Sequence, residues 1–203
     1  NSLGLDKCFE EANNPIELFK KWFAKAEETE INDPNAVAVA TVDDDNQPSV
    51  RMVLLKGLSD KGFVFYTNFN SKKGNDLKNN PNASMCFHWK SIRRQIRVSG
   101  KVSVVDKEEA DKYFSSREYG SKIAAWASSQ SSKMNNRNDF LNKIKEFEKK
   151  FSDKNKVPRP EHWSGWRVNP EQIEFWLEVK NRTHQRLNYF LKEGNWNKEI
   201  LYP

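Results

Sequence analysis

A short apolar segment with a cation at each end is the first candidate for chemistry. Arg51 and Lys56 enclose the apolar residues 52–55. A cation at the edge of an apolar strand costs free energy unless an anion meets it. On an extended chain the two charges lie roughly 17 Å apart and on opposite faces. They therefore predict two separate anionic ligands or the two ends of one site, and a strand with solvated ends is the alternative.

A strand end rich in hydroxyls, followed by a basic helix start, is the second candidate. Tyr66 and Thr67 end an apolar run, and Ser71, Lys72 and Lys73 open a helical pattern soon afterwards. Hydroxyls, lysines and the free N–H groups of a helix start together favour a phosphate. An ordinary helix start with solvated lysines has the same pattern, so both interpretations stay open.

The third candidate combines one arginine with two hydroxyls. Tyr113 and Arg117 are four residues apart and share a helical face, and Ser121 follows at the next helix start. A guanidinium and two hydroxyls can hold a phosphate. Packing and helix capping explain the same three residues equally well.

Alternating basic residues near the C-terminus form the fourth candidate. In an extended segment Arg182, His184 and Arg186 all point to one side, giving three potential cations on one face. Such repulsion favours an anion or an electron-rich ring among them. Gln95 on an inward strand face would need a hydrogen-bond partner such as a heteroaromatic ring, although exposure is the simpler alternative.

Composition limits the class of protein. The chain has 203 residues with 36% hydrophobic side chains, yet it contains 13 Phe, 7 Trp and 5 Tyr, which bury large areas. A modest core with a large interface satisfies both facts, so we expect a homodimer. The net charge of +6 implies anionic partners, but it is dispersed along the chain, so we expect no nucleic-acid partner.

Other sequence features concern compartment and cofactor. Two widely separated cysteines, Cys8 and Cys86, favour reduced thiols and a cytoplasmic location, and they predict no metal site. No apolar run is long enough to cross a membrane, so we expect no membrane partner. Dinucleotide, NTPase, zinc-protease and nucleophile-elbow motifs are all missing. This pattern suits a reaction carried by a bound cofactor while the protein positions the substrate.

The elements that must position these residues are mostly short strands. Asn14-Pro15 begins a helix, and strands are expected at 36–42, 49–55, 63–67, 83–89, 95–105, 166–168, 173–178, 186–191 and 196–200. Further helices are expected at 71–79, 106–116, 121–128 and 139–151, the second opened by an Asp106–Glu109 capping box. Hairpin-sized connections predict a mainly β, α+β fold: an antiparallel barrel or sandwich with peripheral helices in one domain.

Seven segments, taken in chain order, resemble the pyridoxamine/pyridoxine 5′-phosphate oxidase family. They are R-M-V-L-L-K at 51–56, F-Y-T-N at 65–68, R-Q-I-R-V at 94–98, Y-F-S-S-R at 113–117, S-K-I-A-A-W-A-S-S-Q-S-S at 121–132, Q-I-E-F-W at 172–176 and R-T-H-Q-R at 182–186. The resemblance runs from about residue 15 to 203. It implies a single FMN-binding domain over 15–203, folded as an antiparallel split β-barrel, after an N-terminal segment 1–14 that can be flexible. It also implies a homodimer with two FMN sites at the subunit interface.

The resemblance also implies roles for individual residues. The FMN-binding residues would be Arg51, Met52, Val53, Leu54, Tyr66, Thr67, Lys72, Lys73, Gln95, Gln130, Ser131, Trp176 and Arg186. Those that hold the phosphate of the B6 vitamer would be Lys56, Tyr113, Arg117 and Ser121. Arg182 and His184 would bind the substrate ring on the flavin face and act as catalytic residues.

The implied reaction converts pyridoxamine or pyridoxine 5′-phosphate to pyridoxal 5′-phosphate. A hydride passes from C4′ to flavin N5, and oxygen reoxidises the flavin to give hydrogen peroxide. Among the departures from the family pattern, Glu118 stands where a proline is expected, and Gln185 where an aspartate is expected. They support an alternative, a low-turnover member that binds FMN or a B6 vitamer.

Overall fold

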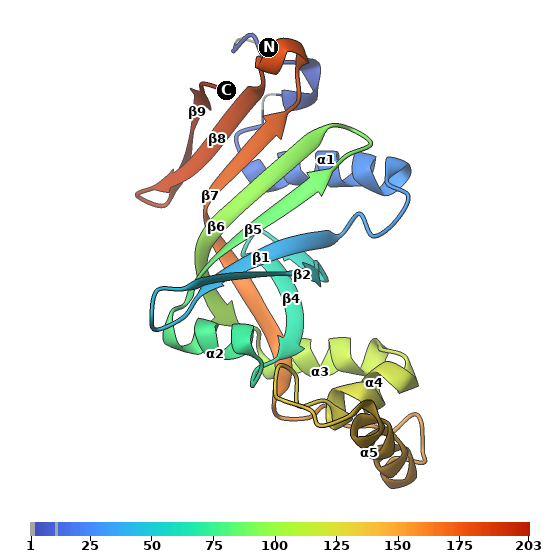
Figure 1. Cartoon of the computed structure of the whole chain (residues 1–203). Helices are drawn as coiled ribbons and strands as arrows, with labels where there is room; N and C mark the ends of the chain where they lie inside the picture. The colour runs from blue at the N-terminus through green and yellow to red at the C-terminus, as the bar shows by residue number, and fades with distance from the viewer. Residues whose placement is uncertain (1–2, 11) are drawn as a thin grey trace.

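An antiparallel sheet of nine strands curls into a split barrel in the computed structural model, which describes residues 3–10 and 12–203 (Figure 1). The strand order is β2-β1-β5-β6-β7-β4-β3, and β8 extends the sheet from β7 and carries β9. The bounds are β1 Ala36–Val42, β2 Pro48–Leu54, β3 Gly57–Ser59, β4 Gly62–Asn68, β5 Asn82–Trp89, β6 Arg94–Val104, β7 Trp163–Leu177, β8 Gln185–Lys192 and β9 Asn195–Leu201. The predicted fold class, mainly β with peripheral helices, is confirmed.

Helices cover opposite ends of this sheet. Their bounds are α1 Pro15–Thr29, α2 Lys72–Asn79, α3 Lys107–Ser116, α4 Tyr119–Ala127 and α5 Arg137–Lys150, with the 3₁₀ turns η1 Lys7–Phe9 and η2 Lys180–Arg182. α1 lies near the termini, whereas α3, α4 and α5 lie together at the other end (Figure 1). Within the described residues, no helix combines the length and apolarity needed to cross a bilayer.

The apolar face of α1 fills the interior of the curled sheet. Asn14 caps the helix by accepting from the N–H of Ile16, as the sequence predicts. The buried ring of Phe19 packs edge-on against Phe63 and Phe87, with centroid distances of 4.9 and 5.1 Å. This aromatic packing joins α1 to strands on both sides of the barrel.

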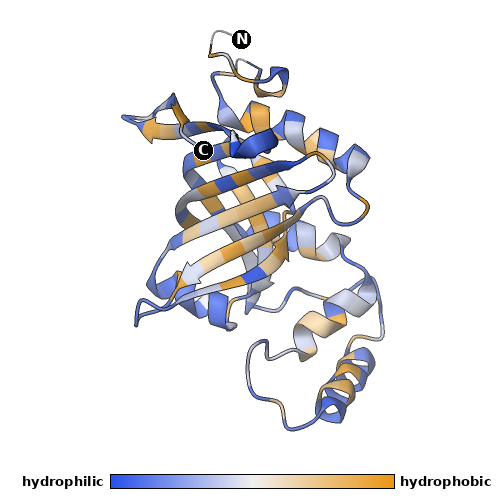
Figure 2. Cartoon of the chain, turned by 45° about the horizontal axis from the view of Figure 1, so that its top comes forward, coloured by the Kyte–Doolittle hydropathy of each residue, from blue (hydrophilic) through white to orange (hydrophobic). Residues whose placement is uncertain are grey.

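A second, smaller core holds the site helices against the end of β7. Phe114, Ile123 and Trp163 are among its buried members, and Ile144 and Phe147 of α5 pack against it. α5 is otherwise polar, with a narrow apolar stripe (Figure 2). α3 and α4 are thereby fixed beside the sheet.

β7 is one long strand where the sequence predicts two, at 166–168 and 173–178. Pro170, which has no N–H to donate, lies between the two expected segments. The structure continues through it with a bulge: Ser99 pairs with Gln172 and Gly100 with Pro170, which leaves Glu171 without a register partner. Gly100 permits this approach, because a Cβ there would lie 2.0 Å from the Asn169 carbonyl oxygen.

The start of the chain packs on the barrel near β8. Phe9 is buried against the Trp22 ring at 5.2 Å, and the Tyr189 hydroxyl donates to the Ala12 carbonyl at 2.8 Å. The N–H of Asp6 donates to Gln185 Oε1 at 2.6 Å. Residues 1, 2 and 11 of the expected flexible segment lie outside the described residues. The domain boundary at 14/15 stays a prediction.

Candidate active site

One cleft of about 790 Å³ brings together most of the predicted site residues. Strands β2 and β4, helices α2, α3 and α4, and the loop after α4 line it. The predicted residues in its lining are Arg51, Met52, Val53, Leu54, Lys56, Tyr66, Thr67, Lys72, Lys73, Tyr113, Arg117, Ser121, Gln130 and Ser131. Both predicted phosphate-binding groups therefore face a single cavity.

The end of β2 explains why Arg51 and Lys56 share this cleft. β2 stops at Leu54, and Leu55 turns into the core with its N–H bonded to Asn35. Lys56 then pairs with β4, its N–H donating to the Val64 carbonyl. The prediction that the two cations point to opposite faces of one strand is thus wrong. Both residues line the same cleft.

Strand β2 presents an apolar face to the outside at the edge of the sheet. Val50, Met52 and Leu54 are 67%, 63% and 39% exposed. An edge strand normally limits such exposure, because apolar edges promote association. The strand therefore suits contact with a flat ligand, a second chain, or both.

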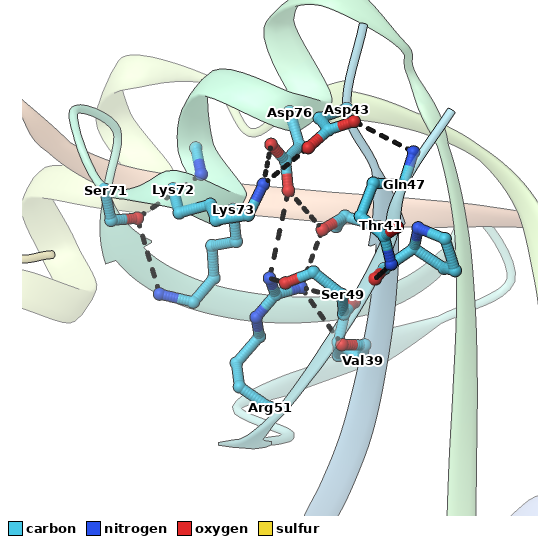
Figure 3. A network of polar contacts seen from close by, with 12 residues as sticks. Val39, Thr41, Asp43, Gln47, Ser49, Arg51, Ser71, Lys72, Lys73 and Asp76 are labelled. Atoms are coloured by element: carbon cyan, nitrogen blue, oxygen red, sulfur yellow. Dashed lines mark hydrogen bonds and ion pairs between the residues drawn. The ribbon is translucent and has the colours of Figure 1, made fainter. Parts of the chain in front are cut away.

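Arg51 is held in place by groups on its inner side (Figure 3). Its Nη1 donates to Thr41 Oγ1 at 2.7 Å and to the Val39 carbonyl at 3.2 Å, and Nη2 donates to the Ser49 hydroxyl. The Asp76 carboxylate lies 3.8 Å from Nη2. Burial lowers the pKa of this arginine from its usual value, and Asp76 opposes that shift. The side chain is oriented before any ligand arrives.

Asp76 is a buried carboxylate that the sequence analysis missed. It is 5% exposed and accepts from Thr41 Oγ1 at 2.6 Å and from Lys72 Nζ at 3.3 Å (Figure 3). Lys72 also donates to Asp43 at 3.0 Å, which raises the lysine pKa and lowers that of Asp43. The only sequence signal was the four-residue spacing between Lys72 and Asp76, which is common on solvated helices.

Lys73 is a buried cation held by neutral groups. Its side chain is 8% exposed, and Nζ donates to Thr67 Oγ1 and Gln130 Oε1, both at 2.9 Å. No carboxylate of the described residues lies within ion-pair distance of it. Burial, with a smaller effect from Arg51, lowers its pKa to about 8. An anion in the cleft would supply the missing counter-charge.

Arg117 is a second cation that has no anionic partner among the residues that the structure describes. Its Nη1 is buried with no hydrogen-bond partner, and its guanidinium carbon lies 4.6 Å from the Trp163 ring centroid. Burial lowers its pKa. Tyr113 stacks on Tyr66 with centroids 4.0 Å apart. Trp163 was not predicted as a site residue, because it precedes the strand expected at 166–168.

Five predicted site residues do not line this cleft: Gln95, Trp176, Arg182, His184 and Arg186. Trp163 begins β7 and lines the cleft, whereas Trp176 lies near the other end of the same strand. Arg186 and Gln95 are the register partners of Trp176 on the neighbouring strands, and the His184 ring lies 4.7 Å from the Trp176 ring. These residues form a second group, which does not line the cleft of the same chain.

The backbone of this second group corrects one prediction and decides between two alternatives for Gln95. Arg182 ends η2 with a φ of 62°, and the chain becomes extended only where Gln185 begins β8. The expectation that Arg182, His184 and Arg186 alternate along one extended segment is therefore wrong for Arg182. Ile96 and Val98 occupy the core face of β6, so Gln95 lies on the opposite, outward face. This outward placement agrees with the simpler alternative, exposure on a sheet face.

Arg186 is fixed by two acceptors. Its Nε donates to the buried Glu174 carboxylate at 2.7 Å, and its Nη1 donates to the Tyr202 carbonyl at 2.9 Å. Glu174 also pairs with Arg97 at 3.1 Å. Across the described part of the chain, no group of three or more His, Cys, Asp or Glu side chains is arranged to hold a metal ion.

Two family profiles match nearly the whole chain. The profile described as "Pyridoxamine 5′-phosphate oxidase" matches residues 23–177, and "Pyridoxine 5′-phosphate oxidase C-terminal dimerisation region" matches 163–203. A relative from Pelagibacter ubique, named pyridoxine/pyridoxamine 5′-phosphate oxidase, is 59% identical and covers 100% of this chain and 98% of its own. One of the same name from Agrobacterium fabrum is 49% identical over 96% of this chain and 95% of its own.

Solved structures share the fold. PhzG from Burkholderia lata, solved with tetrahydrophenazine-1-carboxylic acid, has a TM-score of 0.91 and 29% identity over 98% of this chain and 97% of its own. A pyridoxamine 5′-phosphate oxidase-related FMN-binding protein from Nostoc punctiforme has a TM-score of 0.73 and 16% identity over 91% and 97%. The second likeness concerns the fold alone.

Proposed function

The chain belongs to the pyridoxamine 5′-phosphate oxidase family, and we propose that it uses FMN to oxidise pyridoxamine or pyridoxine 5′-phosphate to pyridoxal 5′-phosphate. One observation carries this proposal. A single cleft contains two cations, the buried Lys73 and the half-buried Arg117, that lack an anionic partner among the described residues. Cofactor and substrate each bring one phosphate, so the two ligands would neutralise the two cations.

The residues around Lys73 fit the FMN phosphate. Arg51 and Lys73 would bind the phosphate oxygens, with Lys72 and Thr67 beside them. The backbone and exposed side chains of β2 at 52–54 would lie along the flavin. Gln130 and Ser131, in the loop after α4, would also contact it. The chemistry that FMN supplies is acceptance of a hydride from C4′ at N5, with reoxidation by oxygen to hydrogen peroxide.

The residues around Arg117 fit the substrate phosphate. Lys56 and Arg117 supply two cations, and Tyr113 and Ser121 supply hydroxyl donors to the same end of the cleft. Tyr66 stacks against Tyr113, and burial raises the pKa of Tyr66 to about 12, so this hydroxyl stays protonated as a donor. The protein's contribution is to orient the substrate and to neutralise its charge.

A partner chain would complete the site. We propose that Gln95, Trp176 and Arg186 of one subunit contact the flavin bound in the cleft of the other, and that Arg182 and His184 cover the substrate ring. Most of these residues lie within the matched dimerisation region, 163–203. The exposed apolar face of β2 supports association through this side. The two free thiols, Cys8 and Cys86, support a reducing, cytoplasmic compartment.

An absorbance experiment tests the function. The purified protein should carry a flavin spectrum, and anaerobic addition of pyridoxamine 5′-phosphate should bleach it. Admission of oxygen should restore the colour and release one hydrogen peroxide for each aldehyde formed. Free FMN with the same substrate is the control and should stay oxidised. A bound flavin that also stays oxidised with both phosphorylated vitamers would refute the proposal.

A further inference from the structure

Arg117 is held by aromatic rings instead of by a carboxylate. Its guanidinium carbon lies 4.6 Å from the centroid of Trp163 and 5.6 Å from that of Phe114. Among the ion pairs of residues 3–10 and 12–203, none includes Arg117. The nearby arginines Arg159 and Arg167, by contrast, pair with Asp111 and Glu109, both at 2.6 Å. Arg117 therefore differs from both of these neighbouring arginines.

The type of partner matters for what Arg117 can bind. A carboxylate would neutralise the guanidinium and occupy two of its N–H groups. A ring face attracts the cation through its quadrupole and uses no N–H donor. Stacking therefore fixes the plane of Arg117 and leaves its hydrogen-bonding edge for a ligand. The buried, unpartnered Nη1 is the donor that such a ligand would take.

Trp163 is itself held rigidly. It is 7% exposed, it stacks on Tyr66 with centroids 5.3 Å apart, and it meets Phe114 edge-on at 5.1 Å. The Trp163 carbonyl accepts from Arg159 Nη1 at 2.7 Å, and Arg159 pairs in turn with Asp111 of α3. These contacts connect the start of β7 to α3. Because the Trp163 ring is fixed, it also fixes the orientation of the Arg117 guanidinium that lies over it.

We propose that Trp163 is a positioning residue that orients Arg117 toward the substrate phosphate. The inference rests on the proposed function, since it takes Arg117 as a ligand of that phosphate. Trp163 also lines the cleft, so direct contact with the vitamer is the competing explanation. The two explanations differ in whether the effect of Trp163 depends on Arg117.

The test compares phosphorylated with unphosphorylated ligand on the FMN-loaded protein. Trp163→Leu removes the ring face and should weaken binding of pyridoxal 5′-phosphate about tenfold, whereas pyridoxal binding should not change. Trp163→Phe keeps a smaller face and should lose only about threefold. In turnover, KM for the phosphorylated substrate should rise in the same order, with kcat nearly constant.

A matched control and a double-mutant cycle separate positioning from packing. Trp126→Leu removes another tryptophan that packs against the same small core but does not line the cleft, and it should leave both affinities unchanged. Arg117→Met keeps the aliphatic stem without the charge. Adding Trp163→Leu to Arg117→Met should then cause no further loss.

Several outcomes would overturn the inference. Equal losses for pyridoxal and its phosphate, or additive losses in the cycle, would mean that Trp163 contacts the vitamer or only packs. A loss in Trp126→Leu as large as in Trp163→Leu would mean general destabilisation, which thermal unfolding of both variants would detect. If Trp163→Leu does not fold, Trp163→Phe carries the same comparison. A wild-type protein that prefers the phosphate but does not oxidise it would refute the proposed function while leaving this inference intact.

Discussion

FMN affinity should fall as the pH rises through about 8, because Lys73 loses its charge there. Burial lowers the pKa of this lysine to about 8, and its neighbours Thr67 and Gln130 are neutral. A phosphate monoester is dianionic above pH ~6, so only the protein charge changes in this range. Binding a dianion raises the lysine pKa in the complex, and affinity is therefore full below pH 8 and declines above it.

The size of the effect follows from that pKa. With a Lys73 pKa of about 8 in the FMN-free protein, the dissociation constant of FMN scales as one plus the ratio of neutral to charged Lys73. Between pH 7 and pH 9.5 this amounts to about a 30-fold weakening, provided that the lysine pKa in the complex lies above 9.5. Arg51 keeps its charge over this range and sets the remaining affinity.

Titration of the apoprotein with FMN, followed by flavin fluorescence at several pH values, measures the effect. Riboflavin has no phosphate and controls for titration of the ring. Lys73→Arg should bind FMN with an almost flat pH profile, since a guanidinium stays charged. Lys73→Met should also be flat, but weaker at pH 7. A wild-type profile that changes less than threefold, or one that Lys73→Arg reproduces, would refute the argument.

The same pKa makes the opposite prediction for the stability of the apoprotein. In the unfolded chain Lys73 returns to its usual value of 10.5, so between about 8 and 10.5 the unfolded state binds more protons than the folded state. The contribution of this lysine to the free energy of unfolding therefore rises with pH across that window. Affinity for FMN falls over the same window.

Three further perturbations test separate parts of the structure. Arg51→Met should mainly raise the dissociation constant of FMN, and Lys56→Met should mainly raise KM for the phosphorylated substrate; if both variants only lower the melting temperature, neither residue binds a ligand. Gln185→Asp should loosen residues 3–10 and speed hydrogen exchange of the Asp6 amide, since the shorter side chain no longer reaches it; a tenfold gain in kcat would instead support the low-turnover alternative. Gly100→Ala should lower the free energy of unfolding by about 2–4 kcal/mol in urea titrations, because the new Cβ meets the Asn169 carbonyl; a loss below about 0.5 kcal/mol would mean that the bulge relaxes.

Local patterns predicted the elements well where local forces decide them. The caps at Asn14 and Asp106 are confirmed, because a side chain and an N–H a few residues away suffice to form them. Glu109, however, pairs with Arg167 and does not complete a capping box, since a strand distant in sequence supplies a stronger partner. The two separate strands expected at 166–168 and 173–178 are wrong for the same reason, because the bulge that joins them depends on β6.

The sequence predicted the residue types of the site better than it predicted their arrangement. Motif order identified the cations and hydroxyls that line one cleft, but Trp163 and Asp76 act through neighbours that the sequence does not place beside them. Arg182 adopts a left-handed backbone that alternation cannot reveal. The distance between the cleft and the group around Trp176 is likewise a property of the folded sheet.

The placement of site residues at both ends of β7 has a genetic consequence. If each site combines the cleft of one subunit with the Arg186 group of the other, a chain defective in Arg51 and a chain defective in Arg186 are both inactive alone. Their heterodimer contains one doubly defective site and one with every residue intact. Random assortment of equal amounts makes about half of all dimers mixed, so about a quarter of the sites recover. Two null alleles would then complement each other within one cell.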